Sequence, residues 1–298
     1  MKIALLTDPR YIAPKEGNAY VENILLEDQI LSHALKRMGF GSQRICWDDT
    51  SADWSSFDLA IFRTTWDYYN RFPEFEAWLK VAEGQVHLLN EPDLVRWNWN
   101  KFYLQELDLL DIRIPPTLFI PINSGKKLAE WVESADWESY ILKPAIGGGG
   151  RHTYFFAKEI PEQISVLFED LNKTEAFLLQ AFQKSIVDEG EISLMVMDGQ
   201  FTHAIRKRAR PGDFRVQDDF GGTVHAYEAS EQEKHFAEEV ISKLKIKPLY
   251  GRLDIIRDDV GLPCVSELEL IEPELWFRHH PASADVLAKG IAALSNSR

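Results

Sequence analysis

Cysteine is scarce in this sequence, because the 298 residues include only Cys46 and Cys264. Two cysteines this far apart indicate neither a disulfide framework nor a thiolate zinc site, and we expect a reducing, cytoplasmic environment. Long apolar runs are missing too. A membrane helix needs roughly 18 to 20 such residues, and the first apolar run is also too short for a signal-peptide core. We therefore expect a soluble protein without a membrane partner.

Positive charge is also in short supply. The chain has 33 Lys and Arg against 47 Asp and Glu, a formal net charge of -14. Such a balance opposes the binding of polyanions, so we expect no nucleic-acid partner. Hydrophobic residues, by contrast, make up 45% of the chain, which is enough for a sizeable core. These numbers predict a globular protein of two or three units.

The spacing of apolar residues predicts a mixture of α/β and α+β structure. A strand, a helix and two further strands over residues 1–92 indicate a small α/β unit with a parallel sheet. A helix from residue 93 to about 109 follows, with Lys101 near its middle, and two prolines then interrupt the pattern. Residues 116–182 predict a smaller α+β unit, and residues 183–298 predict an antiparallel sheet with an inserted helix.

The most informative segment is a predicted hairpin in the last fifth of the chain. Because side chains alternate along a strand, Glu267 and Glu269 share one face. If the turn is centred just after Val260, antiparallel pairing places Asp254 opposite Glu267 and Arg252 opposite Glu269. Carboxylates this close raise one another's pKa unless a cation lies among them, and magnesium prefers oxygen ligands. The alternative is an edge hairpin whose charges simply face solvent.

A glycine run follows a predicted buried strand that ends at Lys143. The backbone of Gly147, Gly148, Gly149 and Gly150 is free to approach a ligand, and its amides can point at phosphate oxygens. Lys143 would add a positive charge beside them. The spacing is neither that of a P-loop nor that of a dinucleotide-binding fingerprint. A flexible linker is the alternative.

Two further segments carry candidate binding residues. A basic stretch includes Arg206 and Arg215, whose guanidinium groups can clamp carboxylates or phosphates, although a solvated loop explains it as well. Residues 63–68 follow the carboxyl end of a predicted parallel strand, where ligands bind in open α/β sheets. Aromatic packing is the alternative there. The candidate substrate contacts are Tyr11, Arg63, Trp66, Asp67 and Tyr68.

Taken in order, these segments resemble the ATP-grasp superfamily, in particular its glutathione synthetase-like and ribosomal-protein glutamate ligase-like members, and more faintly the D-alanine–D-alanine ligases. The resemblance implies an ATP-grasp fold. Residues 1–92 would form a pre-ATP-grasp domain on the substrate side, and residues 93–298 the ATP-grasp domain. Within the latter, residues 116–182 would be a lid and residues 183–298 the catalytic, metal-binding subdomain.

The resemblance also implies roles for individual residues. Lys101 and Lys143 would reach the nucleotide phosphates, and the glycine run would close over them. Adenine would meet the backbone of Gln180, Ala181 and Phe182, and ribose would meet Glu189 and Glu191. Asp254, Glu267 and Glu269 match the magnesium ligands, and Arg206, Arg215 and Arg252 match the phosphate and acyl-phosphate arginines. One departure is Glu269, because these ligases usually have asparagine at the matching position.

By this resemblance we expect an enzyme, an ATP-dependent ligase that forms C–N bonds through an acyl phosphate. Its cofactors would be ATP and Mg²⁺, with Mn²⁺ as a substitute, and its partners a small carboxylate and an amine, such as an amino acid or peptide-like compound. A homodimer is one expected assembly. The alternatives are a kinase, a ligase that closes a ring within one substrate, and a non-catalytic nucleotide-binding module.

Overall fold

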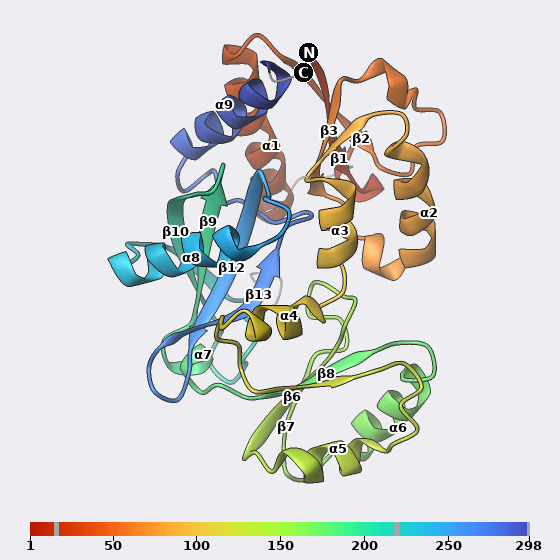
Figure 1. The fold of residues 1–298 in the computed structure, drawn as a ribbon, viewed down its shortest axis with the longest axis vertical. Coiled ribbons are helices and arrows are strands. Elements are labelled where there is room, and N and C mark those ends of the chain that lie inside the picture. Colours follow the sequence, from red (N-terminus) through yellow and green to blue (C-terminus); the bar gives the residue numbers. More distant parts are fainter. Residues whose placement is uncertain (15–17, 217–220, 297–298) are drawn as a thin grey trace.

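The computed structural model describes residues 1–14, 18–216 and 221–296, which fold around three β-sheets (Figure 1). The first sheet is parallel and the other two are antiparallel, so the predicted mixture of α/β and α+β structure is confirmed. Among the helices of these residues, none is long and apolar enough to cross a membrane.

The N-terminal sheet is covered on both faces. Its strands pair in the order β2-β1-β3-β4, with bounds β1 (Lys2–Thr7), β2 (Gly41–Cys46), β3 (Leu59–Thr64) and β4 (His87–Leu89). Successive residues of β1 point to opposite faces. Ile3 and Leu5 pack with α1 (Ala19–Arg37), whereas Ala4 and Leu6 pack with α2 (Phe72–Ala82). Burial on both faces explains the continuous apolar run of this strand.

Two helices pack on one face of the second sheet. Its strand order is β5-β8-β6-β7, with bounds β5 (Thr117–Ile120), β6 (Ser139–Pro144), β7 (Tyr154–Ala157) and β8 (Phe177–Ala181). Along β6, Tyr140 and Leu142 are fully buried in one core with residues of α5 (Leu128–Ala135) and α6 (Glu162–Leu171). Alternation therefore directs Ile141 and Lys143 to the opposite face, where both line a cavity.

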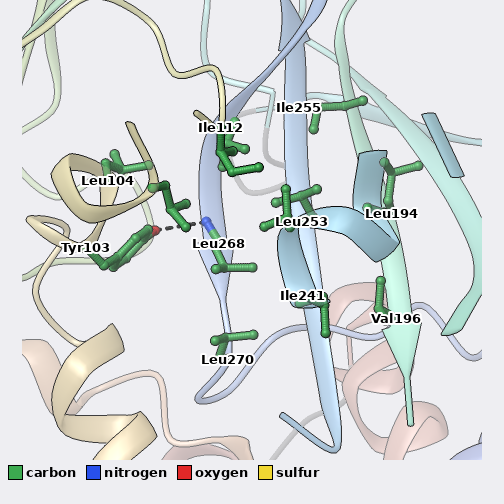
Figure 2. Packing of buried hydrophobic residues seen from close by; sticks show 14 of the residues in the cluster. Tyr103, Leu104, Ile112, Leu194, Val196, Ile241, Leu253, Ile255, Leu268 and Leu270 are labelled. Carbon is green, nitrogen blue, oxygen red and sulfur yellow. Dashed lines mark hydrogen bonds between the residues drawn. The ribbon is translucent and has the colours of Figure 1, made fainter. Parts of the chain in front are cut away.

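The C-terminal sheet has the order β11-β10-β9-β12-β13, with bounds β9 (Glu191–Met197), β10 (Gln200–Arg208), β11 (Thr223–Tyr227), β12 (Tyr250–Arg257) and β13 (Pro263–Glu269). Residues of α4 (Tyr103–Leu109) and α8 (Glu231–Lys243) share its largest core (Figure 2). The N–H of Leu268 donates to the hydroxyl of Tyr103 at 2.9 Å. The short α7 (Ser185–Asp188) precedes β9.

The N-terminal and C-terminal sheets share a core. The last helix, α9 (Ala282–Asn296), packs against α1, and Leu287 of α9 belongs to the same apolar cluster as Ile3 of β1 and Met195 of β9 (Figure 1). The buried amide of Asn90 donates to the carbonyls of Tyr250 (2.8 Å) and Leu270 (2.6 Å). These contacts fix the N-terminal unit to the C-terminal sheet.

The helix predicted from residue 93 to 109 is wrong. The chain forms α3 (Pro92–Asn98) and α4, and Lys101 lies in the turn between them. The side chain of Asn100 accepts a hydrogen bond from the N–H of Phe102, which offers the backbone an alternative to the helix. In this turn the N–H of Lys101 donates to the carbonyl of Ala145 at 2.8 Å, so the lysine docks against the segment that follows β6.

Candidate active site

The β12–β13 hairpin has the predicted register at its acidic end. Asp254 pairs with Glu267, and Arg252 pairs with Glu269. Nearer the turn the register differs by one residue, and a β-bulge at Ser266 separates the two parts. The bulge keeps the glutamates on the same face of the sheet as Asp254. A one-residue slip without it would send them to the other face.

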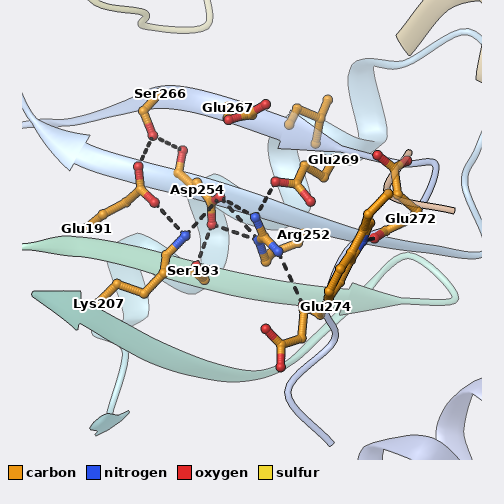
Figure 3. Close-up of polar contacts among 12 residues, drawn as sticks. Glu191, Ser193, Lys207, Arg252, Asp254, Ser266, Glu267, Glu269, Glu272 and Glu274 are labelled. Carbon is orange, nitrogen blue, oxygen red and sulfur yellow. Dashed lines mark hydrogen bonds and ion pairs between the residues drawn. The ribbon is translucent and has the colours of Figure 1, made fainter. Parts of the chain in front are cut away.

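The carboxylates of Asp254, Glu267 and Glu269 form a tight cluster (Figure 3). One oxygen from each lies within 4.8 Å of the others. Oxygens on opposite sides of a bound Mg²⁺ are about 4.2 Å apart, since each Mg–O bond is about 2.1 Å long. The donor set is therefore of the right chemistry and nearly the right spacing for a magnesium ion. Arg252 donates to both Asp254 and Glu269, so its guanidinium group holds these two carboxylates close together.

Asp254 is the most deeply buried member, with 2% of its surface exposed. Burial alone would raise its pKa, but Arg252 and Lys207 outweigh burial and hold the pKa well below its usual range. The ammonium of Lys207 lies 3.2 Å from the Asp254 carboxylate and 2.5 Å from that of Glu191. Burial would lower the pKa of Lys207, yet these two carboxylates raise it overall. The lysine thus stays charged at neutral pH.

The other two carboxylates differ in charge state. Burial would raise the pKa of Glu267, but Lys101, whose Nζ lies 3.1 Å away, and Lys143 lower it overall. For Glu269, burial and the neighbouring carboxylates outweigh the arginine and raise its pKa to about 7. Glu269 is therefore the member of the cluster that gains most from a cation.

A cavity of about 210 Å³, here called the inter-sheet cavity, lies between the second sheet and the C-terminal sheet. Its walls include most of the residues predicted in the sequence to bind ATP and metal. These are Lys101, Lys143, Gly147, Gly148, Gly149, Gly150, Gln180, Ala181, Phe182, Glu191, Arg215, Arg252, Asp254, Glu267 and Glu269. Segments far apart in the chain thus meet at one site.

The glycine run packs against the N-terminal part of the molecule. A Cβ atom added to Gly148 would lie 2.8 Å from the ring of Tyr69, which belongs to the 3₁₀ turn Tyr68–Asn70. Gly149 has a φ of +54°, a conformation that side chains disfavour. The ammonium of Lys101 donates to the carbonyl of Gly147 at 2.5 Å. A side chain at residue 148 or 149 would therefore require Tyr69 or the loop to shift.

Lys143 faces the inter-sheet cavity from β6. Burial outweighs the attraction of Glu267 and lowers the pKa of the lysine to about 8. An ammonium with a lowered pKa gains from any anion that enters the cavity, because the anion would restore its usual charge state. The site is thus suited to a phosphate.

A second cavity of about 290 Å³, here called the aromatic cavity, lies on the other side of the glycine run. Of the predicted substrate contacts, Tyr11, Trp66 and Tyr68 line it. The two cavities share one wall. The residues common to both are Lys101, Gly147, Gly148, Gly149, Lys207, Arg252, Glu267 and Glu269. Ligands in the two cavities would therefore meet at the carboxylate cluster.

Two of the predicted substrate contacts lie elsewhere. Arg63 is 1% exposed and donates to Asp28 at 3.0 Å, so it is a buried structural ion pair. Asp67 accepts hydrogen bonds from the indole of Trp47 (2.7 Å) and from Arg71 (3.1 Å). Neither lines a cavity at the cluster, because each is occupied in holding the N-terminal unit together.

Two of the residues expected at the nucleotide also lie outside both cavities. Arg206 points to the face of β10 opposite the cluster, where its guanidinium lies 4.3 Å above the ring of Tyr227. Glu189 is half-exposed and pairs with Arg257 at 3.2 Å. Lys207, the neighbour of Arg206, occupies the cavity wall instead, because side chains alternate along β10. Glu189 lies before β9 begins, whereas the predicted Glu191 is the first residue of that strand and lines the cavity.

Sequence reasoning missed several residues of the cavity walls, namely Lys207, Phe214, Arg10, Tyr20, Tyr69, Asn98, Glu272, Glu274 and Trp276. For Lys207 a signal was present, because it alternates with Arg206 in a segment already singled out. The others come from loops and helix ends, whose spatial neighbours no periodic pattern reveals.

Comparison with known proteins agrees with this geometry. Residues 101–264, more than half of the chain, match the family described as "Prokaryotic glutathione synthetase, ATP-grasp domain". Residues 3–90 match the family "D-cycloserine synthetase DcsG, N-terminal domain". The cycloserine biosynthesis protein DcsG of Streptomyces lavendulae is 27% identical over 263 residues, covering 82% of this chain and 86% of that protein.

Solved structures show the same relationship. The crystal structure of D-cycloserine synthetase DcsG has a TM-score of 0.87 at 25% identity and covers 99% of both chains. A D-alanine–D-alanine ligase from Bacillus anthracis has a TM-score of 0.68 at 15% identity and covers 99% of this chain and 96% of that one. Both similarities extend over the N-terminal sheet as well as the two later ones. The fold, the matched segment and the site together show that this chain belongs to the ATP-grasp family of prokaryotic glutathione synthetase type.

Proposed function

We propose that this ATP-grasp ligase uses Mg²⁺ and ATP to convert a small carboxylic acid into an acyl phosphate, which a nitrogen nucleophile then converts into an amide. The observation that carries the proposal is the shared wall of the two cavities. Phosphoryl transfer to a carboxylate needs two anions side by side, and this wall combines acidic metal ligands with lysine and arginine.

The inter-sheet cavity is the proposed ATP site. Lys101 and Lys143 would neutralise phosphate oxygens, and the backbone of the glycine run would lie over them. The backbone of Gln180, Ala181 and Phe182 lines the far end, where it would meet adenine. Arg215 also lines this cavity and would add a further charge to the phosphates.

Asp254, Glu267 and Glu269 would hold the metal. A bound Mg²⁺ supplies charge neutralisation between the phosphates and the protein carboxylates. Arg252 already touches two of the three carboxylates and lines both cavities, so it would orient the acid that is to be activated. The glycine run, which packs against Tyr69, would shield the acyl phosphate from water, which would otherwise hydrolyse it.

The chemistry then has two steps. An oxygen of the acid attacks the γ-phosphorus, the bond to the β-phosphate oxygen breaks, and ADP leaves. A neutral amine attacks the acyl carbon, inorganic phosphate departs, and the amine gives up a proton. No side-chain nucleophile takes part, because the lysines, arginine and metal ligands act by placing and neutralising the reactants.

A second candidate is the closing of a ring within one substrate. It is favoured by the likeness to D-cycloserine synthetase, a protein named for a cyclic product, over nearly the whole chain. The small volume of the aromatic cavity, about 290 Å³, suits a single compound that carries both the acid and the nitrogen. Both candidates share the acyl-phosphate step and differ in the origin of the nitrogen.

Hydroxylamine trapping tests the shared step. The purified protein would be incubated with ATP, Mg²⁺, hydroxylamine and a panel of small acids, and ADP and hydroxamate would be measured together. We expect at least one acid to yield both in equal amounts. Release of ADP with a phosphate ester in place of a hydroxamate would indicate a kinase. Absence of ADP release with every acid would contradict the ligase proposal.

A further inference from the structure

The aromatic cavity contains one carboxylate that the metal cluster does not use. Glu272 lines this cavity three residues beyond Glu269 (Figure 3). Within residues 1–14, 18–216 and 221–296, its carboxylate makes no ion pair, unlike the other charged residues of this wall. Arg10 pairs with Asp8, Lys101 with Glu267, Lys207 with Glu191, Arg252 with Glu269, and Glu274 with Arg278.

A buried carboxylate without an ion-pair partner is unfavourable in its charged form, and within the described part of the chain Glu272 is such a group. Burial raises the pKa of Glu272 well above its usual range, and the nearby Glu269 raises it further; Lys101 lowers it but does not outweigh them. The same carboxylate contributes, after burial, to the raised pKa of the Tyr68 hydroxyl, which places the two groups in one neighbourhood. A ligand that brings a positive charge to this end of the cavity would offset the cost.

Aromatic rings surround the same end. The indole N–H of Trp66 donates to the backbone carbonyl of Glu272 at 2.9 Å, which holds the ring beside this residue. The ring of Tyr11 lies 5.8 Å from that of Trp66, centroid to centroid, and the ring of Tyr20 lies 6.4 Å from it. Aromatic faces attract cations, most strongly where water is excluded. Carboxylate and rings therefore favour the same kind of ligand group.

The part of the cavity wall next to Glu272 has different chemistry. There the wall carries Arg252, Lys101 and the metal cluster, which suit a carboxylate. The whole cavity, at about 290 Å³, lies just below the roughly 300 to 1,000 Å³ of sites for drug-sized ligands. A compound that spans it is thus short, with a negative end at the shared wall and a positive end at Glu272.

We propose that Glu272, within the ring set Tyr11, Tyr20 and Trp66, binds the ammonium group of the acid that is activated, so that this acid is a small zwitterionic amino acid. The proposal rests on the proposed function, which assigns the carboxylate end to the shared wall. The ammonium held by Glu272 is distinct from the attacking nitrogen, because a nucleophilic amine must be neutral and must reach the acyl carbon at that wall.

Paired ligands test this assignment. Binding to the protein with MgADP would be measured by calorimetry for both enantiomers of alanine and serine, and for lactate and glycerate, which replace the ammonium by a hydroxyl. We expect at least one amino acid to bind wild type about 10- to 100-fold more tightly than its hydroxy-acid partner, the usual range for a charged hydrogen bond. Glu272→Gln should remove this preference by weakening amino-acid binding alone.

The controls separate this proposal from the ligase proposal. MgADP affinity should be unchanged in Glu272→Gln, which shows that the variant is folded, and Glu272→Asp should restore part of the preference. Glu162→Gln, at an exposed position of α6, should behave as wild type. Equal binding of amino and hydroxy acids to wild type, no binding of either, or a preference that survives in Glu272→Gln would overturn the ammonium site. Amino acids that bind as expected but never yield ADP from ATP would contradict the ligase activity instead.

Discussion

The hairpins β9–β10 and β12–β13 lie side by side in the C-terminal sheet, and each contains a bulge. The sequence predicts which charged residues pair in the second hairpin but not in the first. In β12–β13 the opposed pairs Asp254 with Glu267 and Arg252 with Glu269 occur as predicted. In β9–β10 the turn at residues 198–199 would set Arg206 opposite Glu191, but a shift between Phe201 and His203 places Lys207 there.

The register at each turn explains this difference, because both bulges lie between the turn and the charged residues. In β12–β13 the register next to the turn differs by one residue from the predicted one, and the bulge restores the predicted pairing beyond it. In β12–β13 the bulge at Ser266 keeps Val265 and Leu268 in the same core although they are three residues apart, and the glutamates stay on the cavity face. In β9–β10 the register next to the turn is the one expected from residues 198–199, so the bulge moves the charged residues by one position and changes which cation faces the cluster. A bulge has no reliable sequence signal, and its effect on the pairing of the functional residues depends on the register that the turn sets.

The largest expected effect concerns the hairpin that was predicted correctly. Glu267→Gln should lower kcat by about 100- to 1,000-fold, the usual cost of removing one charge-stabilising group. Glu162→Gln should have no effect, and circular dichroism should be unchanged in both variants. Turnover by Glu267→Gln within a factor of three of wild type would show that the carboxylate cluster is not the metal site.

The next prediction compares Lys207 and Arg206, the two candidate cations of β10. Lys207→Met leaves Asp254 and Glu191 without their shared ammonium, so we expect a loss of about 3 to 5 kcal/mol in the free energy of unfolding and weaker ATP turnover. Arg206→Met loses only a contact with the Tyr227 ring, about 0.5 to 1 kcal/mol, and should keep its turnover. Urea unfolding and ADP release measure both. The reverse ranking would show that Arg206 reaches the nucleotide.

A third prediction removes the bulge itself. Deleting Ser266 leaves a strand that alternates without interruption, so Glu267 should still face Asp254 and Leu268 should still face the helices. The deletion loses only the bonds of the Ser266 hydroxyl to Glu191 (3.0 Å) and to the Asp254 carbonyl (3.0 Å). With two hydrogen bonds at about 1 kcal/mol each, we expect a modest loss of stability and less than tenfold lower kcat/KM. Complete inactivation would mean that the bulge positions the carboxylates directly.

The smallest expected effect is a change in the KM for ATP with pH, which separates Lys143 of the second sheet from Lys207 of the C-terminal sheet. With its pKa lowered to about 8, Lys143 loses its charge as the pH rises from 7 to 9, whereas Lys207, with a raised pKa, keeps its charge. Because the charged form binds phosphate, the KM for ATP should rise severalfold over this range. Lys143→Arg stays charged and should flatten the profile. An unchanged slope in that variant would assign the titration to another group.

Much of the fold could be predicted because its strands and glycine run carry local signals. The apolar runs of β1 and β3, the alternation in β12 and β13, and the glycines after Lys143 were sufficient for fold class and for most of the inter-sheet cavity. The helices α2, α6 and α9 and the strands β7 and β11 were not predicted, and Asn100 interrupts the helix expected around Lys101. The aromatic cavity was only partly predicted, because Glu272 and Tyr69 reach it from loops.

The contact between Tyr69 and Gly148 has a thermodynamic consequence. The glycine run is a common boundary of both cavities, and the tyrosine ring holds it from the N-terminal side. Any displacement of the run alters both chambers together, so the affinity for a compound on one side depends on occupancy of the other. Linkage makes this dependence reciprocal, whichever of the two ligands arrives first.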